Sequence, residues 1–218
     1  MNNLVIRNLS DQLVDLVRDR ILNGTVAADQ AIRQDALAAE LGVSKIPLRE
    51  ALTRLEQEGL VRNHVNRGYF VRSLGAAEAE EVFALRLKLE PEVVALAARR
   101  ATDAERQHAT MAHDALDEET EAHGDGVGAL NRAFHLALIR PSGQAITTML
   151  LERLHVLSQR YVRKHLEPFG RDQRANDEHR TILQLWLDRD AKAVAKATHA
   201  HIRSTIVDLR RQFTAQGD

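Results

Sequence analysis

The chain has 218 residues, of which 44% are hydrophobic, and a formal net charge of −1, so it can bury the core of one or two domains. It contains no cysteine, which excludes a disulfide framework and a thiolate site. The N-terminus lacks the apolar block of a signal peptide, and no run approaches the length of a membrane span. We therefore expect a cytoplasmic protein that does not associate with a membrane.

The first predicted helix covers 10–23 and ends at Gly24. Its apolar stripe consists of Leu13, Leu16, Val17 and Ile21. A predicted loop over 25–33 leads into two shorter helical patterns that meet at Gly42. In the second pattern, over 45–58, apolar residues recur at i, i+3, i+4 and i+7, which is typical of one face of a helix. These residues are Leu48, Ala51, Leu52 and Leu55.

The helix over 45–58 has clear start and stop signals. Ser44 is the expected N-cap, with its hydroxyl accepting a hydrogen bond from a backbone N–H of the first turn. Pro47 lies in that first turn, where its missing N–H costs little, and Gly59 ends the helix. A separate polar strip consists of Lys45, Arg49 and Thr53. The two short helices predict a helix-turn-helix that offers 45–58 to a major groove.

Two β-prone runs, 60–64 and 69–71, flank a turn in which Asn66 and Gly68 supply the backbone freedom that a hairpin needs. The basic residues of this hairpin are Arg62, Arg67 and Arg72. Residues 43–72 contain six basic and three acidic side chains, so phosphate attraction and salt-dependent binding are expected. The pattern predicts a winged helix-turn-helix DNA-binding domain over 1–73, although a structural α+β module with a solvated charged face would also fit.

After Ser73 the sequence becomes rich in Ala, Glu and Leu, and no strand pattern follows. We therefore expect the remainder, 74–218, to form an antiparallel helical bundle, so that the fold is mainly α. The expected helices cover 76–101, 103–122, 127–140, 143–167, 174–189 and 190–213. Pro91 lies inside the first of these and predicts a kink or break near Glu90.

Three helices of the predicted bundle each direct one imidazole toward the interior. His135 follows Asn131 at i+4 beside an apolar stripe, and His179 and His201 share faces with apolar residues of their own helices. Buried imidazoles need partners, which one metal ion with an Asn131 oxygen would supply, whereas hydrogen-bonded core histidines are the alternative. Surface or local roles are assigned to His108, His113, His123, His155, His165 and His199.

One stretch reads LAAELGVSKIPLREALTRLEQEGLV and is followed by NRGYFV. It resembles the DNA-binding domain of the GntR family of bacterial transcription regulators. The resemblance implies DNA contacts by Ser44, Lys45, Arg49, Arg67 and Gly68. Many relatives carry Arg where this chain has Asp35, and Arg33 is the candidate to replace the lost contact.

The segment from Glu80 onward resembles the all-α, FCD-type ligand-binding domain of the FadR-like branch of that family. The matching points are Arg86 with Glu90 and Pro91, the NRAFH run, Glu178 with His179, and His201. The resemblance implies a divalent metal held by Asn131, His135, His179 and His201 at the floor of an effector cavity. Relatives carry Asp in place of Asn131, so weaker metal binding is expected here. Three imidazoles and an oxygen suit Zn²⁺ or Ni²⁺.

An open metal position would accept the carboxylate of a small organic acid, and Arg86 is the candidate effector cation because relatives often place an Arg of this helix in the cavity. A salt bridge from Arg86 to Glu90 at i+4 is the alternative. The predicted function is a ligand-responsive transcriptional regulator that binds a palindromic operator on double-stranded DNA as a homodimer.

Two other functions fit the same pattern less well. One is a ligand-free structural DNA-binding dimer, which would have a filled core. The other is a metal-dependent enzyme fused to a DNA-binding domain, which would need a general base beside the metal. No helical HExxH is present, and Glu178 points about 100° away from its neighbour His179 on a helix, so we do not expect an enzyme.

Overall fold

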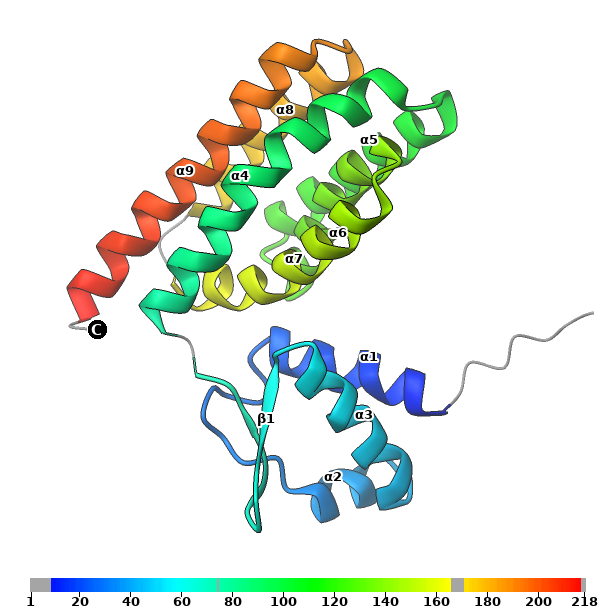
Figure 1. Ribbon diagram of the computed structural model, residues 1–218, viewed down its shortest axis with the longest axis vertical. Helices are drawn as coiled ribbons and strands as arrows, with labels where there is room; N and C mark the ends of the chain where they lie inside the picture. The colour runs from blue at the N-terminus through cyan, green and yellow to red at the C-terminus, as the bar shows by residue number, and fades with distance from the viewer. Residues whose placement is uncertain (1–8, 74, 166–170, 217–218) are drawn as a thin grey trace, which may run out of the picture. The chain divides into compact units, whose positions relative to one another are not determined.

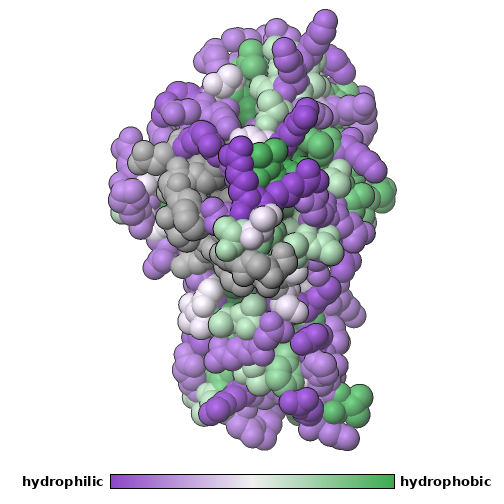
Figure 2. Space-filling model, turned by 90° about the vertical axis from the view of Figure 1, so that its left-hand side faces the viewer, coloured by the Kyte–Doolittle hydropathy of each residue, from purple (hydrophilic) through white to green (hydrophobic). Residues whose placement is uncertain are grey.

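The computed structural model describes residues 9–73, 75–165 and 171–216. Within these ranges the chain forms nine α-helices and one two-stranded antiparallel sheet, so the predicted mainly α fold is confirmed (Figure 1). The chain divides into two compact units, 1–74 and 75–218, each of which has its own core. No helix in the described ranges is long and apolar enough to cross a membrane. The face drawn in Figure 2 is mainly hydrophilic, with scattered apolar side chains.

The first unit is a winged helix-turn-helix. Its elements are α1 (Leu9–Leu22), α2 (Gln34–Glu40), α3 (Lys45–Gln57), β1 (Val61–His64) and β2 (Gly68–Val71). The predicted stripe of α3 is fully buried, and this helix packs against α1. On α1 the stripe differs in one place: Leu16 is 40% exposed, and Val14, 2% exposed, points into the core instead. The turn between α2 and α3 requires the positive φ of +65° that Gly42 adopts.

The wing has a third stretch of chain beside it. β1 and β2 pair in antiparallel register from Val61 with Val71 to His64 with Gly68. The segment 29–32, predicted as loop, runs along β2: the N–H of Ile32 donates to the Tyr69 carbonyl at 2.8 Å, and an isolated bridge joins Ala31 to Phe70. The segment is a loop, as predicted, and its backbone groups also satisfy part of the outer edge of β2.

The second unit is a helical bundle. Its elements are α4 (Ala76–Arg100), α5 (Asp103–Glu121), α6 (Val127–Ile139), the 3-10 turn η1 (Arg140–Ser142), α7 (Ala145–His165), α8 (Arg171–Leu187) and α9 (Ala191–Gln216). Helix α4 packs against α9 and α7, and α5 packs against α6 and α8 (Figure 1). A continuous apolar core that includes Phe134 and Trp186 lies between the helices. The breaker predicted at 168–170 lies outside the described residues.

A kink or break was predicted near Glu90, and helix α4 continues through Pro91 without a break. Proline in a helix interior removes one backbone hydrogen bond and costs about 3 kcal/mol. The flanking residues are buried on both sides, with Glu90 at 0%, Val93 at 4% and Val94 at 1% exposure. Burial of these apolar residues in the bundle offsets the local cost of the proline.

Candidate DNA-binding surface and buried histidine site

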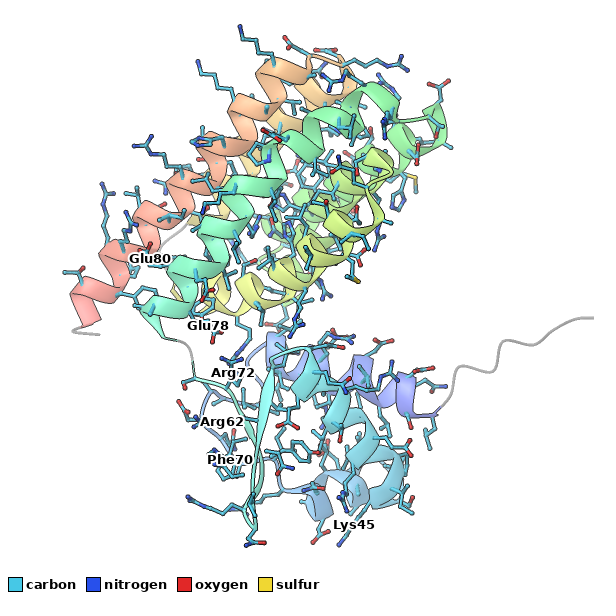
Figure 3. All side chains as sticks on the ribbon, viewed as in Figure 1. Lys45, Arg62, Phe70, Arg72, Glu78 and Glu80 are labelled. Atoms are coloured by element: carbon cyan, nitrogen blue, oxygen red, sulfur yellow. The ribbon has the colours of Figure 1, made fainter. Side chains whose placement is uncertain are left out.

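The recognition helix α3 begins with three exposed polar residues. Ser44 occupies the N-cap position with φ −76° and ψ 163°, as expected, but its hydroxyl makes no capping hydrogen bond. Lys45 forms an ion pair with Asp35 of α2, and both side chains are more than 60% exposed. Arg49 follows one turn later and is also exposed. Figure 3 shows Lys45 at the end of the unit toward which the turn of the wing also extends.

The wing carries the other sequence-predicted contacts. Arg67 is exposed at the hairpin turn, and its guanidinium lies 5.7 Å from the centre of the Phe70 ring. Gly68 has φ +82°, a conformation that favours glycine, and a Cβ there would lie 3.4 Å from the Gln34 side chain. Arg62, opposite Phe70 in the register (Figure 3), pairs with Asp29 at 3.3 Å. Glycine at position 68 therefore allows the left-handed backbone conformation at the wing tip.

Arg33 is exposed at the N-cap of α2. Two apolar residues of this unit, which were not predicted as DNA contacts, are exposed: Ile46 at 72% and Val65 at 86%. Ile46 lies outside the buried stripe of α3, so helical spacing could have predicted its exposure. Val65 directly precedes Asn66 in the hairpin turn. Large exposed apolar side chains next to basic ones suit contact with base edges, such as the methyl group of thymine.

The structure brings the three predicted histidines together. His135 comes from α6, His179 from α8 and His201 from α9, and one ring nitrogen of each lies within 4.8 Å of the others. All three are buried, at 3%, 2% and 7% exposure. The Nε2 atoms of His179 and His201 are 3.3 Å apart. Burial lowers the pKa of His135 to about 4, so this imidazole is neutral at pH 7 and keeps a lone pair available to a metal.

A cavity of about 50 Å³ adjoins these imidazoles. Its wall includes Asn131 and Arg86 as well as the three histidines, so all five residues predicted for the metal and effector sites face one space. A cavity of this size holds roughly four water molecules or a small ligand. The three imidazoles form one group of side chains that could hold a divalent metal, and His135 belongs to a second such group with Glu90 and His155.

Behind the cavity wall, Glu90 is fully buried and connects several helices. Its Oε1 lies 3.2 Å from His135 Nδ1, and its Oε2 lies 3.2 Å from His155 Nε2. Arg86 Nε donates to Oε2 at 2.9 Å, and Arg86 Nη1 donates to the Ser158 hydroxyl at 3.1 Å. Burial opposes the charge of Glu90, but Arg86 and the two histidines hold its pKa well below the ordinary value. The salt bridge and the cavity position of Arg86 thus coexist.

The assignment of His155 and His113 to surface or local roles was wrong. They are only 2% and 4% exposed. His155 follows the buried Leu151 at i+4, and His113 follows Ala109 at i+4, so helical spacing could have placed both in the core. Exposed positions are confirmed for His108, His123 and His199. The side chain of His165 lies outside the described residues.

Comparison with known proteins now identifies the family. Residues 9–71 match the family described as bacterial regulatory proteins, gntR family, and residues 81–204 match the FCD domain. A protein named Nta operon transcriptional regulator, from Aminobacter aminovorans, is 33% identical over 189 residues, which cover 85% of this chain and 78% of that protein. The chain is a GntR-family transcriptional regulator with an FCD domain.

Other relatives agree with this assignment. The HTH-type transcriptional repressor GlaR of Escherichia coli K12 is 26% identical to the regulator over 200 residues, covering 87% of this chain and 90% of GlaR. The structure of E. coli McbR/YncC superposes with a TM-score of 0.84 at 21% identity, covering 95% of this chain and all of that one, which shows a common fold. The matched families and relatives are transcriptional regulators, so the chain is a DNA-binding regulator and the enzyme alternative is excluded.

Proposed function

We propose that the regulator binds an approximately palindromic operator as a homodimer and responds to a small organic acid bound at a metal ion. Asn131, His135, His179 and His201 would hold the metal, which we take to be Zn²⁺ or Ni²⁺. The observation that carries this proposal is the convergence of three buried ring nitrogens within 4.8 Å of one another beside a cavity. A metal at this point would supply a Lewis-acidic position that accepts a carboxylate oxygen.

The charge of the ligands also determines the affinity of the site for a metal ion. Neutral imidazoles and a neutral amide give the metal no charge compensation, whereas the Asp of many relatives would give one negative charge. We therefore expect weaker metal binding than in an Asp-containing site. A weakly held, incompletely coordinated cation favours an anionic ligand, because the ligand's carboxylate completes both the coordination and the charge balance.

The cavity restricts the effector to small molecules. Its volume of about 50 Å³ suits a compact acid better than a long acyl chain. Arg86 places a positive charge in the cavity wall. Its guanidinium already donates hydrogen bonds to Glu90 and Ser158. Its attraction for an acid is therefore reduced by the negative charge of Glu90. A cavity whose wall includes Arg86, Asn131 and three imidazoles also supports ligand binding over the ligand-free structural dimer, which would have a filled core.

DNA binding would use both predicted parts of the first unit. Lys45 and Arg49 on α3 meet the major groove, with Ser44 at the start of the helix, and Arg67 and Gly68 at the wing tip approach the adjacent backbone. Arg33 adds a phosphate contact from the N-cap of α2. Two copies of the chain related by a twofold axis would read two half-sites, which is why a palindromic operator is expected.

A metal-by-acid thermal-shift screen tests the effector half of the proposal. Protein stripped with a chelator is reloaded with Zn²⁺, Ni²⁺ or Mg²⁺ and mixed with small mono- and dicarboxylic acids. We expect Zn²⁺ or Ni²⁺ to raise Tm, and one acid to raise it further only when the metal is present, since a ligand at 100 times its Kd adds about 2.7 kcal/mol. Elemental analysis should find metal in wild type and in the exposed-histidine control His108→Ala.

Two ligand variants complete this test. His179→Ala and His201→Ala should lose the metal while the first unit stays folded, because neither residue belongs to that unit. These two are better probes than His135→Ala, since His135 also contacts the buried carboxylate of Glu90. Equal metal content in wild type and both variants would mean that the metal, if any, binds elsewhere.

A further inference from the structure

We propose that Glu178 is a positioning residue of the histidine site, which holds the His201 imidazole so that its Nε2 faces the metal. The inference rests on the proposed function. It concerns an acidic side chain that sequence reasoning set aside, because neighbouring residues on a helix point about 100° apart. In the folded bundle the same angle lets two neighbouring residues of α8 contact His201. His179 contacts its Nε2 inside the cluster, and Glu178 contacts its Nδ1 from outside.

The geometry of His201 is fixed from two sides. Its Nδ1 lies 2.6 Å from Glu178 Oε2, and its Nε2 lies 3.3 Å from His179 Nε2. A carboxylate accepts hydrogen bonds and donates none when ionised, so contact with Glu178 places the imidazole proton on Nδ1. The neutral ring then presents the lone pair of Nε2 to the centre of the histidine cluster.

A second imidazole of the cluster, that of His135, also has a carboxylate at its Nδ1. Glu90 Oε1 lies 3.2 Å from Nδ1 of His135, so the nitrogen of His135 farther from Glu90 is the one left for a metal. Carboxylates in this outer position fix the tautomer and orientation of a ligating imidazole and increase its basicity. Here they would also place negative charge near a cation whose proposed oxygen ligand, Asn131, is neutral.

Glu178 and Glu90 differ in burial. Glu90 is fully buried and also binds Arg86 and His155, so its removal would disturb the bundle itself. The Glu178 side chain is 28% exposed, so water can replace part of what a substitution removes. Glu178 is therefore the residue at which positioning of the metal ligand can be separated from stability of the fold.

The test compares Glu178→Ala and Glu178→Gln with wild type and with Asp177→Ala, using Zn²⁺ alone as the probe. Asp177 is the preceding acid on α8, with a 79% exposed side chain that pairs with Arg180, so its removal is a matched change of charge. Zn²⁺ affinity is measured by competition with a chromophoric chelator. We expect a 10- to 100-fold loss for Glu178→Ala, a smaller loss for Glu178→Gln, whose amide oxygen still accepts from Nδ1, and a change within about twofold for Asp177→Ala.

Nitrogen-15 NMR of the metal-free protein supplies a readout that a purely structural role would not move. In wild type and Glu178→Gln, His201 should be the Nδ1–H tautomer, and in Glu178→Ala this preference should be lost at unchanged melting temperature. Wild-type affinity in Glu178→Ala, or an Nε2–H tautomer in wild type, would overturn the inference and leave the proposed function standing. If wild type binds neither Zn²⁺ nor Ni²⁺, the proposed function is wrong, and the tautomer still decides whether Glu178 orients His201.

Discussion

Two basic residues that lie one turn apart on α3 have different surroundings. The ammonium of Lys45 pairs with Asp35 of α2. In the described part of the chain, no acidic side chain pairs with the guanidinium of Arg49, which is exposed. A guanidinium that is not already paired can make the bidentate contact to guanine that discriminates between bases. Arg49 is therefore the stronger candidate for base recognition, and Lys45 for attraction to phosphate.

Arg49→Ala should weaken specific operator binding by about 1–3 kcal/mol, because it removes a bidentate base contact. The measurement is a fluorescence-anisotropy titration at fixed salt, against a duplex selected from a random library by the wild-type protein. Arg54→Ala is the matched control: Arg54 lies on the same helix, but its guanidinium pairs with Asp11 of α1. Equal losses in the two variants would assign Arg49 a general charge effect rather than base recognition.

At the level of helices and strands, apolar periodicity predicted most of what the chain forms. The stripe of α3 is buried at every predicted position, because four apolar residues at helical spacing have only one way to leave water together. The failures occur where tertiary contacts overrule local signals. Helix α4 is continuous through Pro91, where a kink or break was predicted, and the residues on both sides of Pro91 are buried. The loop at Ala31 was predicted as a loop, but its isolated bridge to Phe70 of β2 was not indicated by its own sequence.

The same limit applies to the histidine site. The inward faces of His135, His179 and His201 were predictable from spacing along single helices, and their convergence followed from the family resemblance. Contacts between helices were not predictable in this way. Nothing in the sequence near Glu178 indicates that its carboxylate lies 2.6 Å from His201, 23 residues away. The network around Glu90 was missed because His155 was read as a surface residue.

The contacts of Glu90 link α4, α6 and α7 and should make the metal-free bundle acid-sensitive. Burial lowers the pKa of His135 to about 4 from 6.5, and it lowers the pKa of His155 as well, with Arg86 acting in the same direction. Because the folded pKa is the lower one, the unfolded chain binds protons first as pH falls. The stability is complete above about pH 6.5 and is lost as pH falls toward 4, by roughly 3 kcal/mol for His135 alone.

Urea unfolding of chelator-treated protein at pH 7.5 and pH 5.0 checks this expectation. The free energy of unfolding should fall with pH in wild type and in His108→Gln, which replaces an exposed histidine. His155→Gln should show a smaller fall, since one of the two histidines that gain protons on unfolding is gone. Equal stability of the wild type at both pH values would show that the buried imidazoles already carry protons in the folded state.

For the whole molecule, regulation requires a coupling free energy between effector binding in the FCD unit and operator binding in the DNA-binding unit. An effector changes operator affinity only by as much as its own affinity differs between the DNA-competent and DNA-incompetent states. The sign is open on physical grounds, since a ligand that favours either state is equally possible. The magnitude is constrained, because coupling between two sites is the same whichever ligand is added first.

This reciprocity gives a prediction that needs no knowledge of the sign. If the acid identified in the thermal-shift screen changes operator affinity by some factor, operator DNA must change the affinity for that acid by the same factor, expected within about 5- to 150-fold. Calorimetric titration of the metal-loaded protein with the acid, in the presence and absence of saturating operator, measures one side, and anisotropy measures the other. A scrambled duplex of equal length should leave acid affinity unchanged. An acid that binds with the same affinity in all three conditions would be a ligand of the bundle without regulatory effect, because a ligand that does not distinguish two states cannot shift their populations.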